Sequence, residues 1–250
     1  MTARSYVGLI PGVRRVAASL RSGRSSGVRV LQDARFQVKR ARRHQLIEAY
    51  LRAHSERKLH LGTGSNPYVG WLNTDVADFR RLNQVVYLDA RKRFPLPDSS
   101  FDLVFTEHMI EHLTYPEGRH CLAECHRILR PGGRIRVATP SIDQLIQLYD
   151  PRLTDLQRGY MRWATETFIT EADAILPGFI VNNMFRNFGH KFVYDEQTLR
   201  HALQASGFVD VEMCGVGESR DPRLVGLERH MRSVPEFNEF ETIVLEARRP

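Results

Sequence analysis

Short apolar segments that stop at a glycine, a threonine or an acidic residue recur through the middle of this 250-residue chain, and they constrain its fold more than any other feature. Each has the length of one strand, and several are followed by a turn or a helical pattern. Strands that alternate with helices predict a mainly parallel sheet, whose ligands bind beyond the carboxyl ends of the strands. The expected strands cover residues 58–61, 71–76, 85–89, 101–106, 134–139, 208–213 and 240–247.

Two helices can be placed from the signals at their ends. Thr114 is followed three residues later by Glu117, which is capping-box spacing, and the apolar stripe after it stops at Pro131-Gly132-Gly133. Asp195 is the expected N-cap of a later helix, which ends before Gly207. Both helices lie between predicted strands, as an α/β sheet requires.

The rest of the chain divides into segments of different character. Residues 1–57 are expected to form a basic N-terminal helical extension, with an unbroken helical stretch over 28–54. Residues 58–250 are expected to form the main domain, in which 141–192 is a helical insertion over the carboxyl edge of the sheet. Its aromatic residues either line the site as a lid or pack a small core. They are Tyr160, Trp163, Phe168, Phe179 and Phe185.

The net charge of +7 is unevenly distributed. Residues 1–57 hold thirteen Lys or Arg and three acids, an excess of ten positive charges, so the remaining chain carries about −3. Such an extension suits an acidic partner, such as a nucleic acid or a membrane surface, or it is a solvated helix face. We favour the solvated face over nucleic acid, and a homodimer contact through this helix is a further possibility.

Cysteine usage and hydropathy indicate the compartment. Cys121, Cys125 and Cys214 form neither a C-x-x-C pair nor a disulfide framework, which indicates a reducing environment. No segment approaches the roughly 20 apolar residues of a membrane-spanning helix. The first 25 residues also lack the continuous apolar core of a signal peptide. We therefore expect a cytoplasmic protein.

Glycines and acids follow three successive strands. Gly62 and Gly64 come directly after the first strand, where the lack of side chains lets a ligand approach the backbone. Position 67 is Pro67, so the full G-x-G-x-x-G dinucleotide pattern is absent. Asp75 and Asp89 lie near the ends of the next two strands, where carboxylates can accept hydrogen bonds from ribose hydroxyls and an adenine amine. Their order predicts a nucleoside pocket.

The same segments resemble a known family. LHLGTGSNPYVGWLNTDV, YLDA, FPLPDSSFDLVFTEHMIEHL and RILRPGGRIRVATP are similar to class I S-adenosylmethionine-dependent methyltransferases, particularly small bacterial members associated with sugars and polysaccharides. The resemblance implies a Rossmann-like fold with a seven-stranded, mainly parallel sheet whose last strand is reversed. It also implies a set of residues that bind S-adenosylmethionine. These are Gly62, Thr63 and Gly64 at the methionine part, Asp75 at the ribose, Asp89 and Ala90 at the adenine, and Thr106 and Glu107 at the sulfonium.

The segment Thr106–Leu113, TEHMIEHL, contains two Glu-His pairs. If this segment is helical, His108, Glu111 and His112 share one face. As a bare pattern, His108-x-x-Glu111-His112 is the H-x-x-E-H of a class of zinc peptidases, with two zinc ligands and a general base. The alternative without chemistry is that both histidines only cover the helix.

The family resemblance adds another interpretation of the same residues. Some related methyltransferases carry E-x-x-E-H after this strand and bind Mg²⁺ with it. Here Glu111 and His112 match, but His108 replaces the first glutamate. Mg²⁺ is the first candidate, although two imidazoles and a carboxylate favour Zn²⁺, Mn²⁺ or Fe²⁺. His190, where the chain returns from the insertion, is the fourth expected ligand, and His108 or His112 is the expected catalytic base.

Together these observations predict an S-adenosylmethionine-dependent O-methyltransferase, and the expected metal ligands add a divalent cation to this prediction. The expected acceptor is a small polyhydroxylated molecule, such as a sugar or oligosaccharide. A methyltransferase of nucleic acids is the second hypothesis, based on the basic extension. A protein that binds S-adenosylmethionine without catalysis is the third.

Overall fold

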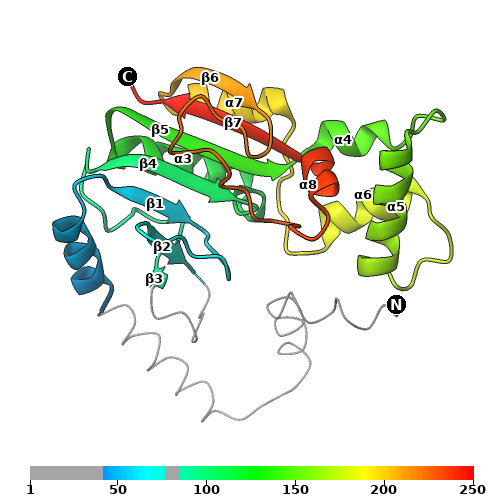
Figure 1. Ribbon diagram of the computed structural model, residues 1–250, viewed down its shortest axis with the longest axis horizontal. Coiled ribbons are helices and arrows are strands. Elements are labelled where there is room, and N and C mark those ends of the chain that lie inside the picture. Colours follow the sequence, from blue (N-terminus) through cyan, green and yellow to red (C-terminus); the bar gives the residue numbers. More distant parts are fainter. Residues whose placement is uncertain (1–41, 77–84) are drawn as a thin grey trace, which may run out of the picture.

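The computed structural model describes residues 42–76 and 85–250, and its centre is a seven-stranded sheet (Figure 1). The strand order is β3-β2-β1-β4-β5-β7-β6, and β7 runs antiparallel to both of its neighbours. This arrangement confirms the predicted fold, including the reversed last strand. The strands are β1 (Lys58–Leu61), β2 (Leu72–Asp75), β3 (Val85–Tyr87), β4 (Phe101–Glu107), β5 (Leu129–Pro140), β6 (Val209–Cys214) and β7 (Thr242–Arg248).

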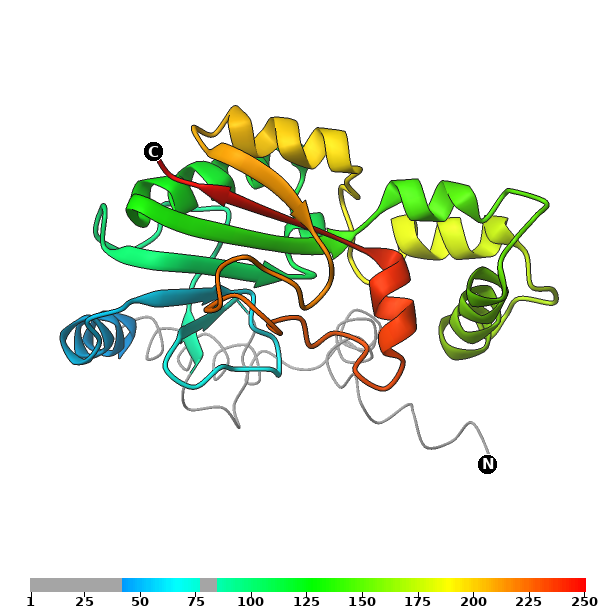
Figure 2. The same ribbon diagram turned by 45° about the horizontal axis from the view of Figure 1, so that its top comes forward.

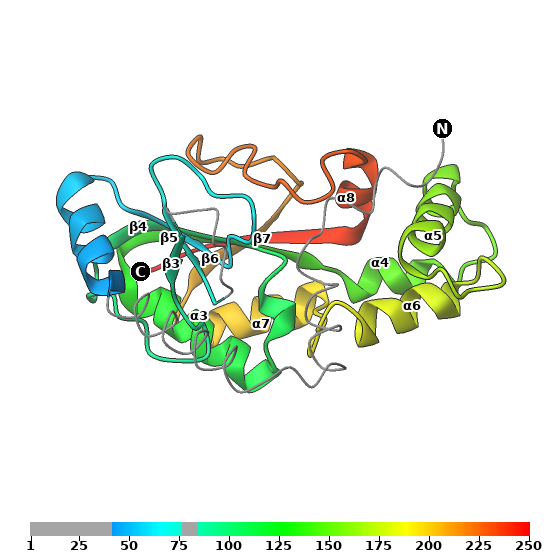
Figure 3. The same ribbon diagram turned by 90° about the horizontal axis from the view of Figure 1, so that it is seen from below.

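One face of the sheet is covered by two helices with the end signals that the sequence contains (Figure 3). Helix α3 (Tyr115–Ile128) begins at Thr114 with a complete capping box to Glu117, and α7 (Glu196–Gln204) begins at Asp195, whose side chain accepts from the Thr198 N–H. Their apolar faces join the main core. The other helical elements are η2 (Ile110–His112), α4 (Ile142–Gln147), α5 (Asp155–Phe168), α6 (Pro177–Arg186) and α8 (Pro235–Glu241).

Two strands start two or more residues away from the predicted position. Strand β5 begins at Leu129, not at 134, because Leu129 pairs with Phe101 before a register shift. Strand β7 begins at Thr242, not at 240, because the residues before Thr242 form helix α8. Pro235 lies in the first turn of this helix, a position that proline favours. Phe240 therefore packs against Tyr160 of the inserted helices instead of against the sheet.

Loops, not helices, cover much of the opposite face of the sheet (Figure 3). Strands β1 and β2 are joined by residues 62–71 without a helix. Residues 215–234, here called the 215–234 loop, return across the same face between β6 and α8. Side chains of both loops pack with side chains of β4 in one apolar cluster. It consists of Tyr68, Trp71, Leu103, Phe105, Leu224 and Leu227.

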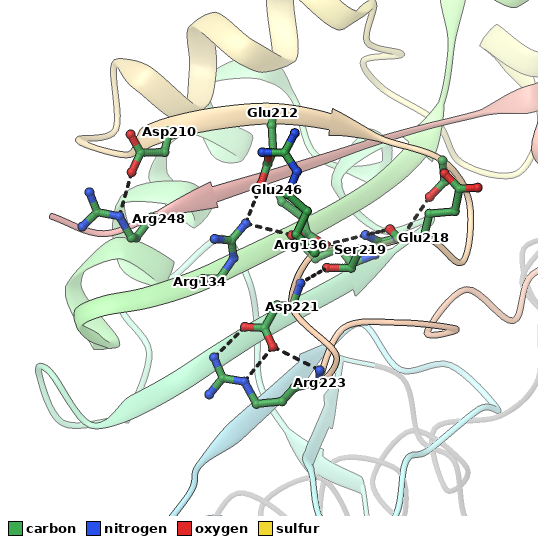
Figure 4. A network of polar contacts seen from close by, with 12 residues as sticks. Arg134, Arg136, Asp210, Glu212, Glu218, Ser219, Asp221, Arg223, Glu246 and Arg248 are labelled. Atoms are coloured by element: carbon green, nitrogen blue, oxygen red, sulfur yellow. Dashed lines mark hydrogen bonds and ion pairs between the residues drawn. The ribbon is translucent and has the colours of Figure 1, made fainter.

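A buried arginine fastens the 215–234 loop to the sheet. The guanidinium of Arg136, on β5, is fully buried and donates to Glu228 of the loop (Nε to Oε1, 2.6 Å) and to Glu246 of β7 (Nη1 to Oε1, 2.5 Å). It also donates to the carbonyls of Gly215 and Glu218. Figure 4 shows Arg136 and Glu246 within a larger polar network. Glu246 is also paired with Arg134 (3.0 Å), whereas Arg136 is the one ion-pair partner of the buried Glu228 side chain among the described residues. Removing Arg136 would leave Glu228 buried without a cation, which is costly.

The helices inserted after β5 form a separate lobe beside the sheet (Figure 2). Helices α4, α5 and α6 pack around a second apolar core of their own. Tyr160, Trp163 and Phe168 pack in a row within this core, with Tyr160 only 1% exposed. Phe185 differs, since it is 44% exposed. Most of the aromatic residues of the insertion are therefore core residues.

Residues 42–53, the described part of the predicted N-terminal helix, are helical. Ile47 and Tyr50 of this helix belong to the main core, and the Tyr50 hydroxyl donates to the Lys58 carbonyl at the start of β1. Residues 1–41, which carry most of the basic extension, and residues 77–84 lie outside the described residues. Within the described ranges, none of the helices has both the length and the apolar character needed to cross a bilayer.

Replacing Arg136 by methionine should destabilise the fold by about 3–5 kcal/mol, because Glu228 would stay buried without its cation and Glu246 would keep only its pair with Arg134. Urea denaturation measures this free energy of unfolding. The matched control is Arg152→Met, since Arg152 forms an ion pair with Asp150 while 88% exposed and should cost at most about 1 kcal/mol. Equal losses in the two variants would contradict the anchoring role.

Candidate functional site

The glycine turn after β1 is tied to the end of β2. The Gly64 N–H donates to Asp75 (Oδ2, 2.9 Å), and the Gly62 N–H donates to the Thr74 carbonyl. Both glycines have positive φ, +73° and +54°, which a residue with a side chain adopts only with strain. At Gly62 a Cβ would also come within 2.3 Å of Met109, whereas the space beside Gly64 is open. The turn thus leaves room for a ligand at Gly64.

Asp89 follows β3 and is held by its own loop. Its carboxylate is 7% exposed and accepts from the Arg91 side chain (Nε to Oδ1, 2.8 Å), while Lys92 lies 3.5 Å away. The hydrogen bonds from Arg91 lower the pKa of Asp89, so it is a carboxylate at neutral pH. The Leu88 N–H donates to the carbonyl of Asp75, which brings the ends of β2 and β3 together. Ala90 packs against the main core.

Thr106 and Glu107 end β4 beside the glycine turn. Thr106 pairs in register with Leu61, and its buried hydroxyl has no hydrogen-bond partner among the described residues. Glu107 faces the 215–234 loop, where its carboxylate accepts from the backbone N–H groups of Arg229 and His230 at 2.8 Å. Burial raises the pKa of Glu107 to about 7. The Glu107 carboxylate, which was expected beside the sulfonium, is thus already bound by the backbone of the 215–234 loop.

The segment after Glu107 is not the α-helix that the Glu-His spacing suggested. Strand β4 continues through Glu107, and His108 adopts φ +46°, a left-handed conformation that few residues with side chains adopt. Only Ile110–His112 is helical, as the short 3₁₀ helix η2. His108 and His112 consequently do not share a helix face.

Glu111, His112 and His190 meet at the start of this short helix, with possible ligand atoms within 4.8 Å of one another. Glu111 is fully buried; its Oε2 accepts from Thr139, but its Oε1 has no hydrogen-bond partner among the described residues. Nδ1 of His190 lies 2.7 Å from the Met184 carbonyl. A proton on Nδ1 would donate there and leave a lone pair on Nε2, which lies 4.0 Å from Glu111 Oε1.

Burial sets the ionisation of this first group. It raises the pKa of Glu111 to about 8 and lowers the pKa of His190 to about 4. It also lowers the pKa of His112, against the smaller opposing effect of the Asp75 carboxylate. Both imidazoles are therefore neutral at pH 7, which is the form that binds metals.

His108 belongs to a second group, with His230 of the 215–234 loop and Glu241 of α8. The rings of His108 and His230 are stacked, with centroids 3.8 Å apart. Glu241 accepts a hydrogen bond from the hydroxyl of Tyr160, on the inserted helix α5. The two groups adjoin, because His108 Nδ1 lies 3.6 Å from Glu111 Oε1.

The four predicted metal ligands are thus divided between two groups of three. Glu111, His112 and His190 form one group, and His108 lies in the other. The two histidines of a peptidase H-x-x-E-H motif bind one ion from one helix, so this geometry does not fit a zinc peptidase. Sequence reasoning missed His230 and Glu241, since both lie more than 120 residues from His108 and neither belongs to a recognisable motif.

The described residues fit S-adenosylmethionine at the carboxyl ends of β1 to β4. The donor and acceptor groups available are the open turn at Gly64, the Asp75 and Asp89 carboxylates and the unpartnered hydroxyl of Thr106. A nucleoside with a charged amino-acid tail needs such hydroxyl acceptors and close backbone approach. Residues 77–84 between β2 and β3 lie outside the described part of the site.

Comparison with known proteins identifies the same region. Residues 59–137 match the family described as a methyltransferase domain. A 47-residue stretch is 47% identical to a probable S-adenosylmethionine-dependent methyltransferase of Mycolicibacterium smegmatis, over 19% of this chain and 18% of that protein. An uncharacterized 37.1 kDa protein of a Streptomyces fradiae transposon is 28% identical over 55% of this chain and 45% of its own length. The chain therefore matches less than half of the length of either relative.

Solved structures give weaker similarity. An S-adenosylmethionine-dependent methyltransferase from Mesorhizobium loti superposes with a TM-score of 0.48 at 19% identity, over 82% of this chain and 98% of that one. One from Archaeoglobus fulgidus gives a TM-score of 0.47 at 18% identity, over 86% and 94%. The assignment of the fold therefore depends on the family match over residues 59–137 and on the strand order with its reversed β7. The sheet of this chain is that of a class I S-adenosylmethionine-dependent methyltransferase domain.

Proposed function

We propose that the chain transfers a methyl group from S-adenosylmethionine to a hydroxyl of a small polyhydroxylated acceptor, a sugar or oligosaccharide, with the help of a divalent cation. The observation that carries this proposal is the buried group of Glu111, His112 and His190 beside the donor site. It supplies ligands for a cation where an acceptor hydroxyl would meet the methyl donor.

On the donor side, strand ends would hold the cofactor. The Gly62–Gly64 turn and Thr63 would contact its methionine part, and the Asp75 carboxylate would accept from the ribose hydroxyls. Asp89 and the backbone N–H of Ala90 would bind the adenine. Thr106 offers its buried hydroxyl near the expected sulfonium. Glu107 would lie near the same centre, while its contacts with the Arg229 and His230 backbone keep that loop closed over the site.

On the acceptor side, the distances of the first group suit a cation. The 4.0 Å between Glu111 Oε1 and His190 Nε2 is too long for a hydrogen bond. It can be spanned by an ion that lies about 2.0–2.2 Å from each atom. The unpartnered, buried Oε1 of Glu111 also requires a cation or proton nearby. Two imidazoles and one carboxylate suit Zn²⁺, Mn²⁺ or Fe²⁺ better than Mg²⁺.

Methyl transfer is an in-line displacement at the sulfonium carbon, and a neutral hydroxyl is a weak nucleophile. When bound, the cation would orient neighbouring hydroxyls and lower the pKa of one of them. Of the two predicted bases, His112 would be a ligand of this cation, so its lone pair is not available for a proton. His108 is the remaining candidate base, since burial lowers its pKa and keeps its imidazole neutral. A vicinal diol matches this arrangement, because one oxygen can be held while its neighbour is activated.

Replacing Asp75 by alanine should weaken binding of S-adenosylhomocysteine about 10- to 100-fold, since hydrogen bonds to a carboxylate contribute about 1.5–3 kcal/mol. Isothermal titration calorimetry measures this change. Asp173→Ala is the matched control, because Asp173 lies on an exposed part of the inserted lobe. If the unaltered protein gives heat with NAD but none with S-adenosylhomocysteine, the donor assignment is wrong.

Glu111→Gln and treatment with EDTA should each reduce turnover by at least about 100-fold, because a cation at the acceptor supplies several kcal/mol of transition-state stabilisation. Formation of S-adenosylhomocysteine reports turnover. Affinity for S-adenosylhomocysteine should be unchanged, which separates this effect from misfolding. Glu166→Gln, on the exposed face of α5, is the control. Full turnover in EDTA would exclude the cation.

Radiolabelled S-adenosylmethionine and a panel of mono- and disaccharides test the acceptor class. The label should appear in an ether that resists mild base, which a methyl ester would not. The rate should change little between about 50 and 200 mM salt, whereas methylation of a nucleic acid would lose affinity steeply over that range. Transfer to RNA or DNA but to none of the sugars would replace this hypothesis with the nucleic-acid one.

A further inference from the structure

His108, His230 and Glu241 come from three separate parts of the fold. His108 follows β4, His230 lies in the 215–234 loop, and Glu241 ends α8, which packs between the sheet and the inserted lobe (Figures 1 and 2). Their possible ligand atoms nevertheless lie within 4.8 Å of one another. Such convergence of two imidazoles and a carboxylate is the donor set of many zinc sites.

We propose that His108, His230 and Glu241 form a second divalent-cation site, next to the one formed by Glu111, His112 and His190. The site takes a cation of the Zn²⁺ class, because its donors are two nitrogens and one carboxylate oxygen. This site is additional to the cation invoked for methyl transfer, and when it is filled His108 is a ligand and not a free base. It stands on its own contacts, and no acceptor is needed to detect it.

The backbone at His108 directs its ring into this group. His108 adopts φ +46°, and its N–H donates to the Ala138 carbonyl of β5. A left-handed conformation at a residue with a side chain costs about 1–3 kcal/mol. The contacts of the ring offset that cost: it stacks on His230, and its Nε2 lies 3.3 Å from the Thr242 hydroxyl. An extended conformation there would point the ring elsewhere.

Burial of the three side chains favours a cation over a solvated cluster. His108 has a side-chain exposure of 12%, and Glu241 is 7% exposed. The Tyr160 hydroxyl is the partner of one carboxylate oxygen, Oε2, of Glu241. Metal-binding carboxylates and imidazoles are usually oriented by such outer hydrogen bonds. The Tyr160 contact therefore serves as an outer support for the ligand Glu241.

His108 also joins the two groups. A ligating imidazole commonly donates its other ring N–H to a carboxylate. Nδ1 of His108 lies 3.6 Å from Glu111 Oε1, so the carboxylate of one site is the neighbour of a ligand of the other. The second cation would tie the sheet, the 215–234 loop and the inserted lobe together at the acceptor side of the domain.

Titration of the metal-free, full-length protein with Zn²⁺ tests this inference. Equilibrium dialysis followed by elemental analysis should give two equivalents of Zn²⁺ per chain. His230→Gln and Glu241→Gln should each bind one equivalent, since each removes one ligand of the second site. His190→Gln should also bind one, because it affects the first site only. His201→Gln and Glu239→Gln, both exposed, are matched controls that should retain two.

The outcomes separate the two sites. If the unaltered protein binds a single equivalent that is lost in His190→Gln and kept in both His230→Gln and Glu241→Gln, the second site does not exist and the first stands. If the single equivalent is lost in His230→Gln and Glu241→Gln but kept in His190→Gln, the second site stands and the proposed methyl-transfer cation fails. Each variant's circular dichroism must match that of the unaltered protein, so that a lost equivalent of Zn²⁺ reports a lost ligand and not misfolding.

Discussion

The buried ion pairs of Arg136 with Glu228 and Glu246 hold in place the part of the candidate site that the 215–234 loop supplies. Arg136 lies on β5, and Glu228 immediately precedes Arg229 and His230. The backbone of those two residues binds Glu107 at the end of β4, and the ring of His230 stacks on His108. The Arg136 guanidinium thereby holds the 215–234 loop on the sheet, and the loop in turn positions His230.

This arrangement compensates for missing helices. The short β1–β2 connection leaves one face of the sheet without the helix that parallel strands usually require. The 215–234 loop covers that face with Leu224 and Leu227, and its backbone polar groups need partners because they are near the core. Arg136 supplies donors to two of its carbonyls, so the same residue satisfies the loop's polar groups and its carboxylate.

Local signals in the sequence were sufficient for the frame of the fold. The strands, the Thr114 capping box and the Asp195 cap depend on residues within a few positions of one another, and all of them occur in the structure. The start of β7 was predicted two residues too early. Phe240 and Glu241 fit a strand pattern, but both contact Tyr160 of the inserted lobe and belong to α8. Tertiary contact overrides local preference there.

The candidate site also divides into a part with local signals in the sequence and a part that depends on tertiary contacts. Gly62, Gly64, Asp75 and Asp89 each follow a strand, so their common location was predictable from sequence alone. The shared face of His108, Glu111 and His112 required a helix through TEHMIEHL, but the left-handed backbone at His108 separates His108 from the short helix that contains the other two. Glu111 and His112 then face His190, which the insertion returns to the site, whereas His108 faces residues near the end of the chain. The residues of the strand ends are therefore encoded locally. The two groups around Glu111 and His108 depend on contacts across more than 70 residues of sequence, so their geometry depends on the insertion and on the 215–234 loop.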